Sequence, residues 1–200
     1  MSKFYCLEKP RHAWGDYYDI LMHGMSSRSD PEGAVLQLKR TGPFVPPVSL
    51  PGGGDIIVTD AFRRELETSG LEGLRFQPVM KKLIARYNWD AWDRDAKEPV
   101  KYPRGGEPEN YILGKRHNAA AAEQMGELWE VLLGETARVH RVGSTGACDI
   151  YLLTDSWRGE DLFHAQGVGY IYATERAKGW LEEHAKECVA FREASTKDTI

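Results

Sequence analysis

The sequence lacks the features that mark several large classes of protein. Only three cysteines occur among its 200 residues, and none belongs to a CxxC pair. This spacing predicts neither a disulfide framework nor a zinc knuckle. No run of about 18 apolar residues is present, and the first residues lack the apolar core of a signal peptide. We therefore expect a soluble protein of the reducing cytoplasm with no membrane partner.

Basic side chains are also too few to favour a polyanionic partner. The 26 Lys and Arg residues stand against 30 Asp and Glu residues, which gives a formal net charge of −4. Binding to nucleic acid usually relies on a basic surface, so this balance argues against a nucleic-acid partner. Hydrophobic residues make up 42% of the chain. A chain of this length and composition can fold as a single domain over residues 1–200.

Motifs of phosphate binding, acyl transfer and metal binding are absent as well. The glycines Gly52–Gly54 precede a predicted strand, whereas a phosphate-binding loop follows a strand and opens a helix. Ser144 lies within Gly143–Gly146, which predicts a hairpin turn and does not match a nucleophile elbow. None of the six histidines has the spacing of a metal-binding pair. The sequence thus predicts no cofactor, no metal site and no catalytic residue.

What the sequence does contain is an alternation of short strands and helices, which predicts an α+β fold. Residues 14–20 and 34–38 predict strands, and the proline-rich and glycine-rich residues 41–54 predict a surface loop. Apolar residues recur at helical spacing from Ala121 to Leu132, which predicts one helix over residues 118–134. The expected architecture is a mixed or antiparallel sheet with a few helices.

Alternating residues 137–142 and 147–153 predict a β-hairpin. Residues 55–79 and 170–194 each predict a strand, a short helix and a second strand. Matching residues in these two segments are 115 positions apart, as in Thr59/Thr174, Leu66/Leu181 and Phe76/Phe191. The constant spacing indicates either an internal repeat or two ordinary units with the same amphipathic pattern.

Two stretches combine aromatic residues with carboxylates, and they are the predicted partner-binding surface. Tryptophan and tyrosine supply contact area at low entropic cost, while carboxylates can meet a basic partner. The alternative for the same residues is ordinary packing, with partly buried rings beside solvated acids. The predicted binding residues are Trp89, Asp90, Trp92, Asp93 and Asp95 in one stretch and Asp16, Tyr17 and Asp19 in the other.

The first strand–helix–strand segment contains a characteristic series of residues, namely Ile56–Asp60, Phe62, Leu66, Gly70–Gly73 and Phe76–Val79. This series resembles a motif of immunity proteins from bacterial polymorphic toxin systems, the immunity-eleven family. The resemblance implies a small cytosolic antitoxin that binds a cognate toxin and carries no catalytic residue. The paired cysteines of the zinc-containing double-CxxCG relatives are missing here. The segment Ile171–Phe191 repeats the pattern.

Three functions are compatible with these observations. The first is an immunity protein, not an enzyme, that neutralises a cognate toxin by occluding it. The second is a small cytosolic enzyme of unknown class that uses a carboxylate and a histidine, such as His140 or His117, in a cleft. The third is a scaffold or an oligomer-forming protein without an antagonist.

Overall fold

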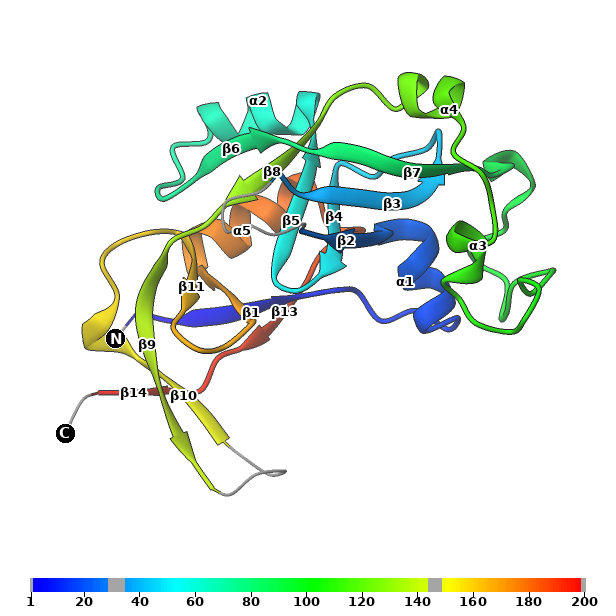
Figure 1. Cartoon of the computed structure of the whole chain (residues 1–200). Helices are drawn as coiled ribbons and strands as arrows, with labels where there is room; N and C mark the ends of the chain where they lie inside the picture. The colour runs from blue at the N-terminus through cyan, green and yellow to red at the C-terminus, as the bar shows by residue number, and fades with distance from the viewer. Residues whose placement is uncertain (1, 29–34, 144–148, 199–200) are drawn as a thin grey trace. The chain divides into compact units, whose positions relative to one another are not determined.

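Short strands dominate the computed structural model, which describes residues 2–28, 35–143 and 149–198. Together with a few helices they form an α+β fold with antiparallel and mixed sheets, as the sequence predicts (Figure 1). The chain groups into two units. The first unit comprises Met1–Lys9, Arg64–Arg75 and Leu132–Ile200, and the second comprises Pro10–Arg63 and Phe76–Val131.

The described part of the second unit contains two sheets. The three-stranded sheet has the order β2-β3-β7, in which β3 runs antiparallel to β2 and parallel to β7. The four-stranded sheet has the order β4-β5-β8-β6, in which β5 is antiparallel to β4 and to β8. The strands are β2 (Met25–Ser27), β3 (Gln37–Gly42), β4 (Val48–Gly52), β5 (Asp55–Thr59), β6 (Arg75–Pro78), β7 (Met80–Arg86) and β8 (Leu128–Leu132).

Short helices connect these strands, and the boundary between the units falls within α2, β6 and β8. The helices are α1 (Asp16–His23), α2 (Asp60–Thr68), α3 (Asn110–Leu113) and α4 (Ala119–Gln124), with a 3-10 helix, η1, over Trp89–Ala91.

The described part of the first unit is built on a seven-stranded sheet with the order β13-β1-β12-β11-β9-β10-β14. Strand β1 is antiparallel to both of its neighbours, β12 and β13. The elements are β1 (Phe4–Glu8), β9 (Glu135–Val142), β10 (Asp149–Leu153), η2 (Thr154–Ser156), β11 (Leu162–Ala165), β12 (Ile171–Thr174), α5 (Glu175–His184), β13 (Ala190–Glu193) and β14 (Thr196–Lys197).

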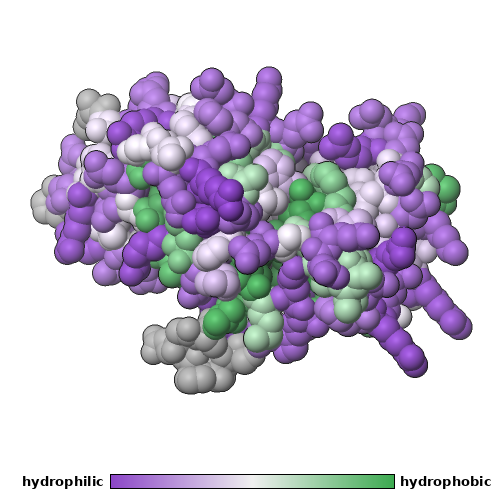
Figure 2. All heavy atoms as spheres, turned by 90° about the horizontal axis from the view of Figure 1, so that it is seen from above, coloured by the Kyte–Doolittle hydropathy of each residue, from purple (hydrophilic) through white to green (hydrophobic). Residues whose placement is uncertain are grey.

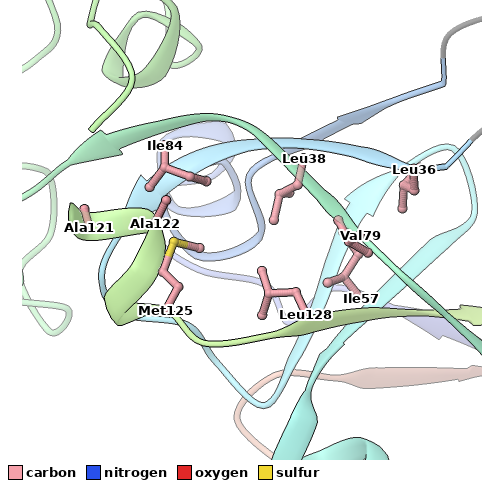
Figure 3. Packing of buried hydrophobic residues seen from close by; sticks show 9 residues of the cluster. All are labelled: Leu36, Leu38, Ile57, Val79, Ile84, Ala121, Ala122, Met125 and Leu128. Carbon is pink, nitrogen blue, oxygen red and sulfur yellow. The ribbon is translucent and has the colours of Figure 1, made fainter. Parts of the chain in front are cut away.

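Each unit has apolar cores of its own. In the second unit, residues from the end of α4 face strand residues such as Ile84 and Leu128 (Figure 3). This cluster consists of Leu36, Leu38, Ile57, Val79, Ile84, Ala121, Ala122, Met125 and Leu128. The core of the first unit consists of Phe4, Cys6, Ala137, Leu152, Phe163, Ala165, Tyr172 and Ala194. Burial of these side chains supplies the main driving force for folding.

A buried arginine organises the interior of the second unit. Arg40 on β3 is 0% exposed. Its guanidinium donates to the carbonyl oxygens of Thr41 and Phe44, both at 3.0 Å, and to that of Met22 at 3.3 Å. It also lies 3.3 Å from the hydroxyl of Ser49. Burial lowers the pKa of Arg40, and among the described residues no carboxylate pairs with it. Carbonyl oxygens from several segments therefore compensate the cost of burying this cation.

Two predicted elements are wrong. The sequence predicts a strand over residues 14–20, whereas the structure has helix α1 there, because Tyr18, Leu21 and Met22 lie on one helical face and are buried together. The predicted helix over 118–134 ends after α4, and residues Leu128–Leu132 form strand β8. Gly126 takes a positive φ of 67° and turns the chain. Pairing with β5 then overrides the helical spacing.

The predicted loop over residues 41–54 is partly wrong, and the predicted hairpin is confirmed. Strand β4 occupies Val48–Gly52 and includes Pro51. Because β4 is the edge strand of its sheet, the missing N–H of a proline is tolerated there. Strands β9 and β10 pair antiparallel from Asp149↔Val142 to Leu153↔Arg138. Ser144 in the predicted turn lies outside the described residues.

The two units contain a common arrangement of strands, which we call the shared module. In the second unit it is β4-β5-β8-β6, and in the first it is β11-β12-β1-β13. Helix α2 follows β5 as helix α5 follows β12, and the helices start 115 residues apart, at Asp60 and Glu175. The registers also match, because Thr59 lies opposite Leu128, and Thr174 lies opposite Phe4.

Equivalent side chains make equivalent contacts in the two modules. The hydroxyl of Thr59 accepts from the backbone N–H of Phe62 at 3.3 Å, and that of Thr174 accepts from Ala177 at 3.2 Å. On the next turn, the Arg63 guanidinium lies 4.5 Å from the ring centroid of Trp129. At the matching place, the Lys178 ammonium lies 5.3 Å from the ring of Tyr5. The likeness thus extends from strand order to single contacts.

In the view of Figure 2, hydrophilic residues cover most of the face, and apolar residues gather in a few places. In the part of the chain that the structure describes, no helix is long and apolar enough to cross a bilayer. Among the exposed large apolar residues, three lie close together in the sequence, namely Val100, Tyr102 and Leu113.

Candidate functional site

The two predicted binding stretches lie together in the second unit. Their rings form a cluster with Tyr87, which follows β7, and Tyr111 on α3, and we call this group the aromatic cluster. The indole rings of Trp14 and Trp92 are 5.6 Å apart, and those of Trp89 and Trp92 are 4.4 Å apart. The aromatic cluster consists of Trp14, Tyr17, Tyr18, Tyr87, Trp89, Trp92 and Tyr111. The sequence predicted the two stretches but not that they meet.

Hydrogen bonds around His12 fix one stretch against the other. The indole N–H of Trp14 donates to the carbonyl of Ala96 at 2.7 Å. The Trp14 backbone N–H donates to Nδ1 of His12, so the ring proton lies on Nε2, which donates to the Arg94 carbonyl at 2.8 Å. The His12 ring also stacks on Tyr18 with centroids 3.8 Å apart. These contacts hold the rings of the aromatic cluster in fixed positions, with Trp14 and Tyr18 buried.

The carboxylates of both stretches lie around the rings and mostly face solvent. Asp16, Asp90, Asp93 and Asp95 are exposed, and Asp19 is partly buried. A carboxylate oxygen of Asp93 accepts from the backbone N–H of Asp95 at 3.0 Å, which shapes the turn after η1. Rings that pack against each other and acids that remain hydrated agree with both interpretations of these residues, packing and partner binding.

A cavity of about 600 Å³ opens beside the aromatic cluster, within the second unit. Its aromatic walls come from Trp14, Tyr87, Trp92, Tyr102 and Tyr111. The phenol of Tyr111 donates to the Lys101 carbonyl, and that of Tyr102 donates to the carboxylate of Glu98 at 2.8 Å. These bonds connect α3 and the loop before it to the walls. A cavity of this size with apolar walls and a few polar groups is typical of binding sites.

Basic side chains line the same cavity, which the sequence analysis missed. Lys101, Arg104 and Lys115 are exposed lining residues, and Asp93 is the carboxylate among the described lining residues. Within the described chain, no carboxylate lies within ion-pair distance of these three cations. The available signal was four basic residues among prolines and glycines, namely Lys101, Arg104, Lys115 and Arg116. The chain as a whole is acidic, so this local basic group distinguishes the cavity.

The tyrosines of the cavity stay neutral near neutral pH. Burial is the main cause that raises the pKa of Tyr111, to about 12, and nearby tyrosines add to it. Burial also raises the pKa of Tyr87. Phenols with such pKa values serve as hydrogen-bond donors and ring contacts at physiological pH, and they are poor general bases.

The histidines of the enzyme alternative are not joined to carboxylates. Nδ1 of His117 accepts from the backbone N–H of Ile84 at 3.2 Å, and His140 is exposed on β9, opposite Tyr151. Among the described residues, neither imidazole has a hydrogen bond to a carboxylate. The described ranges also contain no group of three side chains placed to hold a metal ion.

A second polar cluster lies in the first unit and is fully hydrogen-bonded. Asp161 is buried, and its carboxylate accepts from the Glu72 backbone N–H at 2.8 Å, from the Thr174 hydroxyl at 2.6 Å and from Arg176. Burial acts to raise the pKa of Asp161, but the hydrogen bonds from Arg176, Thr174 and Glu72 outweigh it and hold the pKa below its usual value. This cluster fixes the start of α5 and has the character of a structural link.

Comparison of the chain with protein-family models and with curated proteins gave no match. The functional inference therefore starts from the aromatic cluster, its carboxylates and the cavity beside it.

Proposed function

We propose that this chain is a cytoplasmic immunity protein that binds a cognate bacterial toxin and neutralises it by occlusion. The observation that carries the proposal is the meeting of two sequence stretches, around Trp14 and around Trp92, in one aromatic cluster bordered by carboxylates. The resemblance of residues 55–79 to the immunity-eleven family supports the same function. No bond is made or broken in this mode of action.

The physics of protein interfaces supports this use of the aromatic cluster. Tryptophan and tyrosine dominate binding energy in interfaces because they bury large areas at a small cost in side-chain entropy. The bonds of His12 and Trp14 hold the rings in place before binding, so little further ordering is needed. Exposed carboxylates at the margin attract a basic surface over long range and speed association. A toxin with a basic active site would fit this surface.

Co-expression with the toxin encoded beside its gene tests the proposal directly. We expect the chain to protect the host cell and to co-purify with the toxin. Lack of both protection and complex formation would contradict the proposed function.

Charge reversal then tests the predicted surface. We expect Asp90→Lys combined with Asp93→Lys to slow association with the toxin about tenfold at low salt, because carboxylates at a margin act mainly on encounter. Surface plasmon resonance at two salt concentrations measures this. The matched control is Glu65→Lys with Glu183→Lys, two exposed acids on α2 and α5. Equal association of the two double variants would exclude this margin from the interface.

A further inference from the structure

The walls of the cavity beside the aromatic cluster indicate which chemical group it can bind. Trp14 and Tyr111 are each 6% exposed, so two of its walls are held within the fold. Tyr87 and Trp92 are partly buried lining residues and present aromatic surface to the cavity. Aromatic rings prefer edge-to-face or offset contacts with other rings. The walls therefore favour a planar aromatic group.

The rim of the cavity carries exposed apolar side chains. Val100 is 89% exposed and Tyr102 is 46% exposed, and both line the cavity. Apolar residues that gather at the mouth of a cavity are typical of a protein interaction site, because a partner removes them from water. This favours a side chain of a protein over a free small molecule.

The charge of the lining adds a requirement for anions. Lys101, Arg104 and Lys115 stand against Asp93 alone among the described charged lining residues. Guanidinium and ammonium groups form strong, charge-assisted hydrogen bonds with carboxylates. An aromatic group would pack against the aromatic walls, and carboxylates beside it would pair with the cations of the lining.

We propose that the cavity receives an aromatic side chain of the partner protein that is flanked by aspartate or glutamate residues. This inference rests on the proposed function, since it names the anchor by which the partner is held. The carboxylates around the aromatic cluster would then contact basic residues of the partner, and the cations of the cavity would contact its acidic residues. Such a pattern gives specificity, because a partner of uniform charge would be repelled at one of the two places.

Short peptides test the anchor without the toxin. The probe is Ac-Glu-Phe-Asp-amide, titrated into the isotope-labelled full chain and followed by amide chemical shifts. We expect shifts confined to residues 87–115 and to neighbours of Trp14. Two probes of the same length serve as controls, Ac-Glu-Ala-Asp-amide without the ring and Ac-Lys-Phe-Lys-amide with reversed charge. We expect each control peptide to bind at least tenfold more weakly.

A variant pair then tests the cations. We expect Lys101→Ala, Arg104→Ala and Lys115→Ala together to weaken binding of Ac-Glu-Phe-Asp-amide about tenfold. The matched control removes three exposed cations elsewhere, Arg75→Ala, Arg158→Ala and Lys186→Ala, and should bind as the parent chain does. Equal weakening of both triple variants would show a non-specific charge effect and overturn the proposal.

The remaining outcomes are also decisive. Absence of shifts around the cavity, or equal binding of the three peptides, would overturn the proposal even if the chain protects cells from its toxin. If the peptide binds at the cavity but the chain neutralises no toxin, the inference about the cavity stands and the proposed function is refuted. The two failures are therefore distinguishable.

Discussion

The shared module occurs in both units, but the segments attached to it differ. In the second unit, residues 87–127 lie between β7 and β8 and carry η1, α3, α4 and walls of the cavity. In the first unit, the module adjoins the hairpin of β9 and β10 and the short strand β14. The comparison teaches that the common strands serve as scaffold, whereas the candidate binding features lie outside them, in residues 14–19 and 87–115 of the second unit.

The two units also stabilise their polar interiors in different ways. The second unit buries a cation, Arg40, among carbonyl oxygens. The first unit buries an anion, Asp161, and surrounds it with an arginine, a hydroxyl and a backbone N–H. Arg40 lies on β3, outside the shared module, and Asp161 directly precedes β11. The second unit also buries the Glu130 carboxylate, which pairs with Arg28. Substitution of either residue therefore removes a buried charge from one unit only.

The largest expected effect comes from Arg40→Ala. Removing the buried side chain leaves a cavity and several carbonyl oxygens without a donor, so we expect a loss of about 3 to 5 kcal/mol in the free energy of unfolding. Urea denaturation of the full chain measures it. Arg86→Ala, an exposed arginine on β7, is the control and should change stability by less than about 0.5 kcal/mol. A loss below about 1 kcal/mol in Arg40→Ala would show that the carbonyl shell does not depend on the guanidinium.

The next effect comes from Asp161→Asn, and it depends on pH. We expect a loss of about 2 to 3 kcal/mol at pH 7, because a charged acceptor for Arg176 and the Glu72 N–H is removed. The folded pKa of Asp161 is lowered, so this carboxylate contributes its full stability above its unfolded pKa of about 4. The contribution is lost as the pH falls through the folded pKa.

Denaturation curves of parent and Asp161→Asn chains across the acid range measure this difference. The difference between their free energies of unfolding, which we call the gap, should stay constant from neutral pH to about pH 5 and shrink below about pH 4. Asp90→Asn, at an exposed carboxylate, should show no such gap. A gap that persists unchanged in acid would contradict the assigned role of the charge.

The smallest effects compare the two modules contact by contact. Arg63 lies 4.5 Å from the Trp129 ring and Lys178 lies 5.3 Å from the Tyr5 ring. We expect Arg63→Met to cost about 1 kcal/mol and Lys178→Met about half of that, since tryptophan and the closer cation give the stronger cation–π contact. Double-mutant cycles with Trp129→Leu and Tyr5→Leu isolate the two coupling energies. A coupling energy in one module and none in the other would show that the two contacts are not equivalent.

The parts of the fold that the sequence predicts well are those with agreeing local signals. In residues 55–79, Thr59 caps the helix, Phe62 and Leu66 share its buried face, and Gly70 takes the positive φ of 74° that follows it. The residues of β8 carry helical spacing, but pairing with β5 decides their structure. Long-range pairing of this kind leaves no local signal in a single sequence.

The candidate site was predictable in its parts and not in its assembly. The aromatic and acidic residues around Tyr17 and Asp93 are visible as stretches of unusual composition. Their meeting depends on contacts such as that of Trp14 with Ala96, which are 82 residues apart. The cavity and its cations also depend on the path of the loop before α3, and no periodic pattern specifies that path.

The position of β1 between β12 and β13 has a consequence for synthesis of the protein. Its residues, Phe4–Glu8, are synthesised long before those of its neighbours, Ile171–Thr174 and Ala190–Glu193. Until then the edges of this apolar strand have no native partner, which invites mispairing with other chains. The sheet of the first unit therefore cannot close around β1 before residue 193 is synthesised, and a nascent chain that stalls before residue 171 leaves both edges of β1 open to chaperones that shield strand edges.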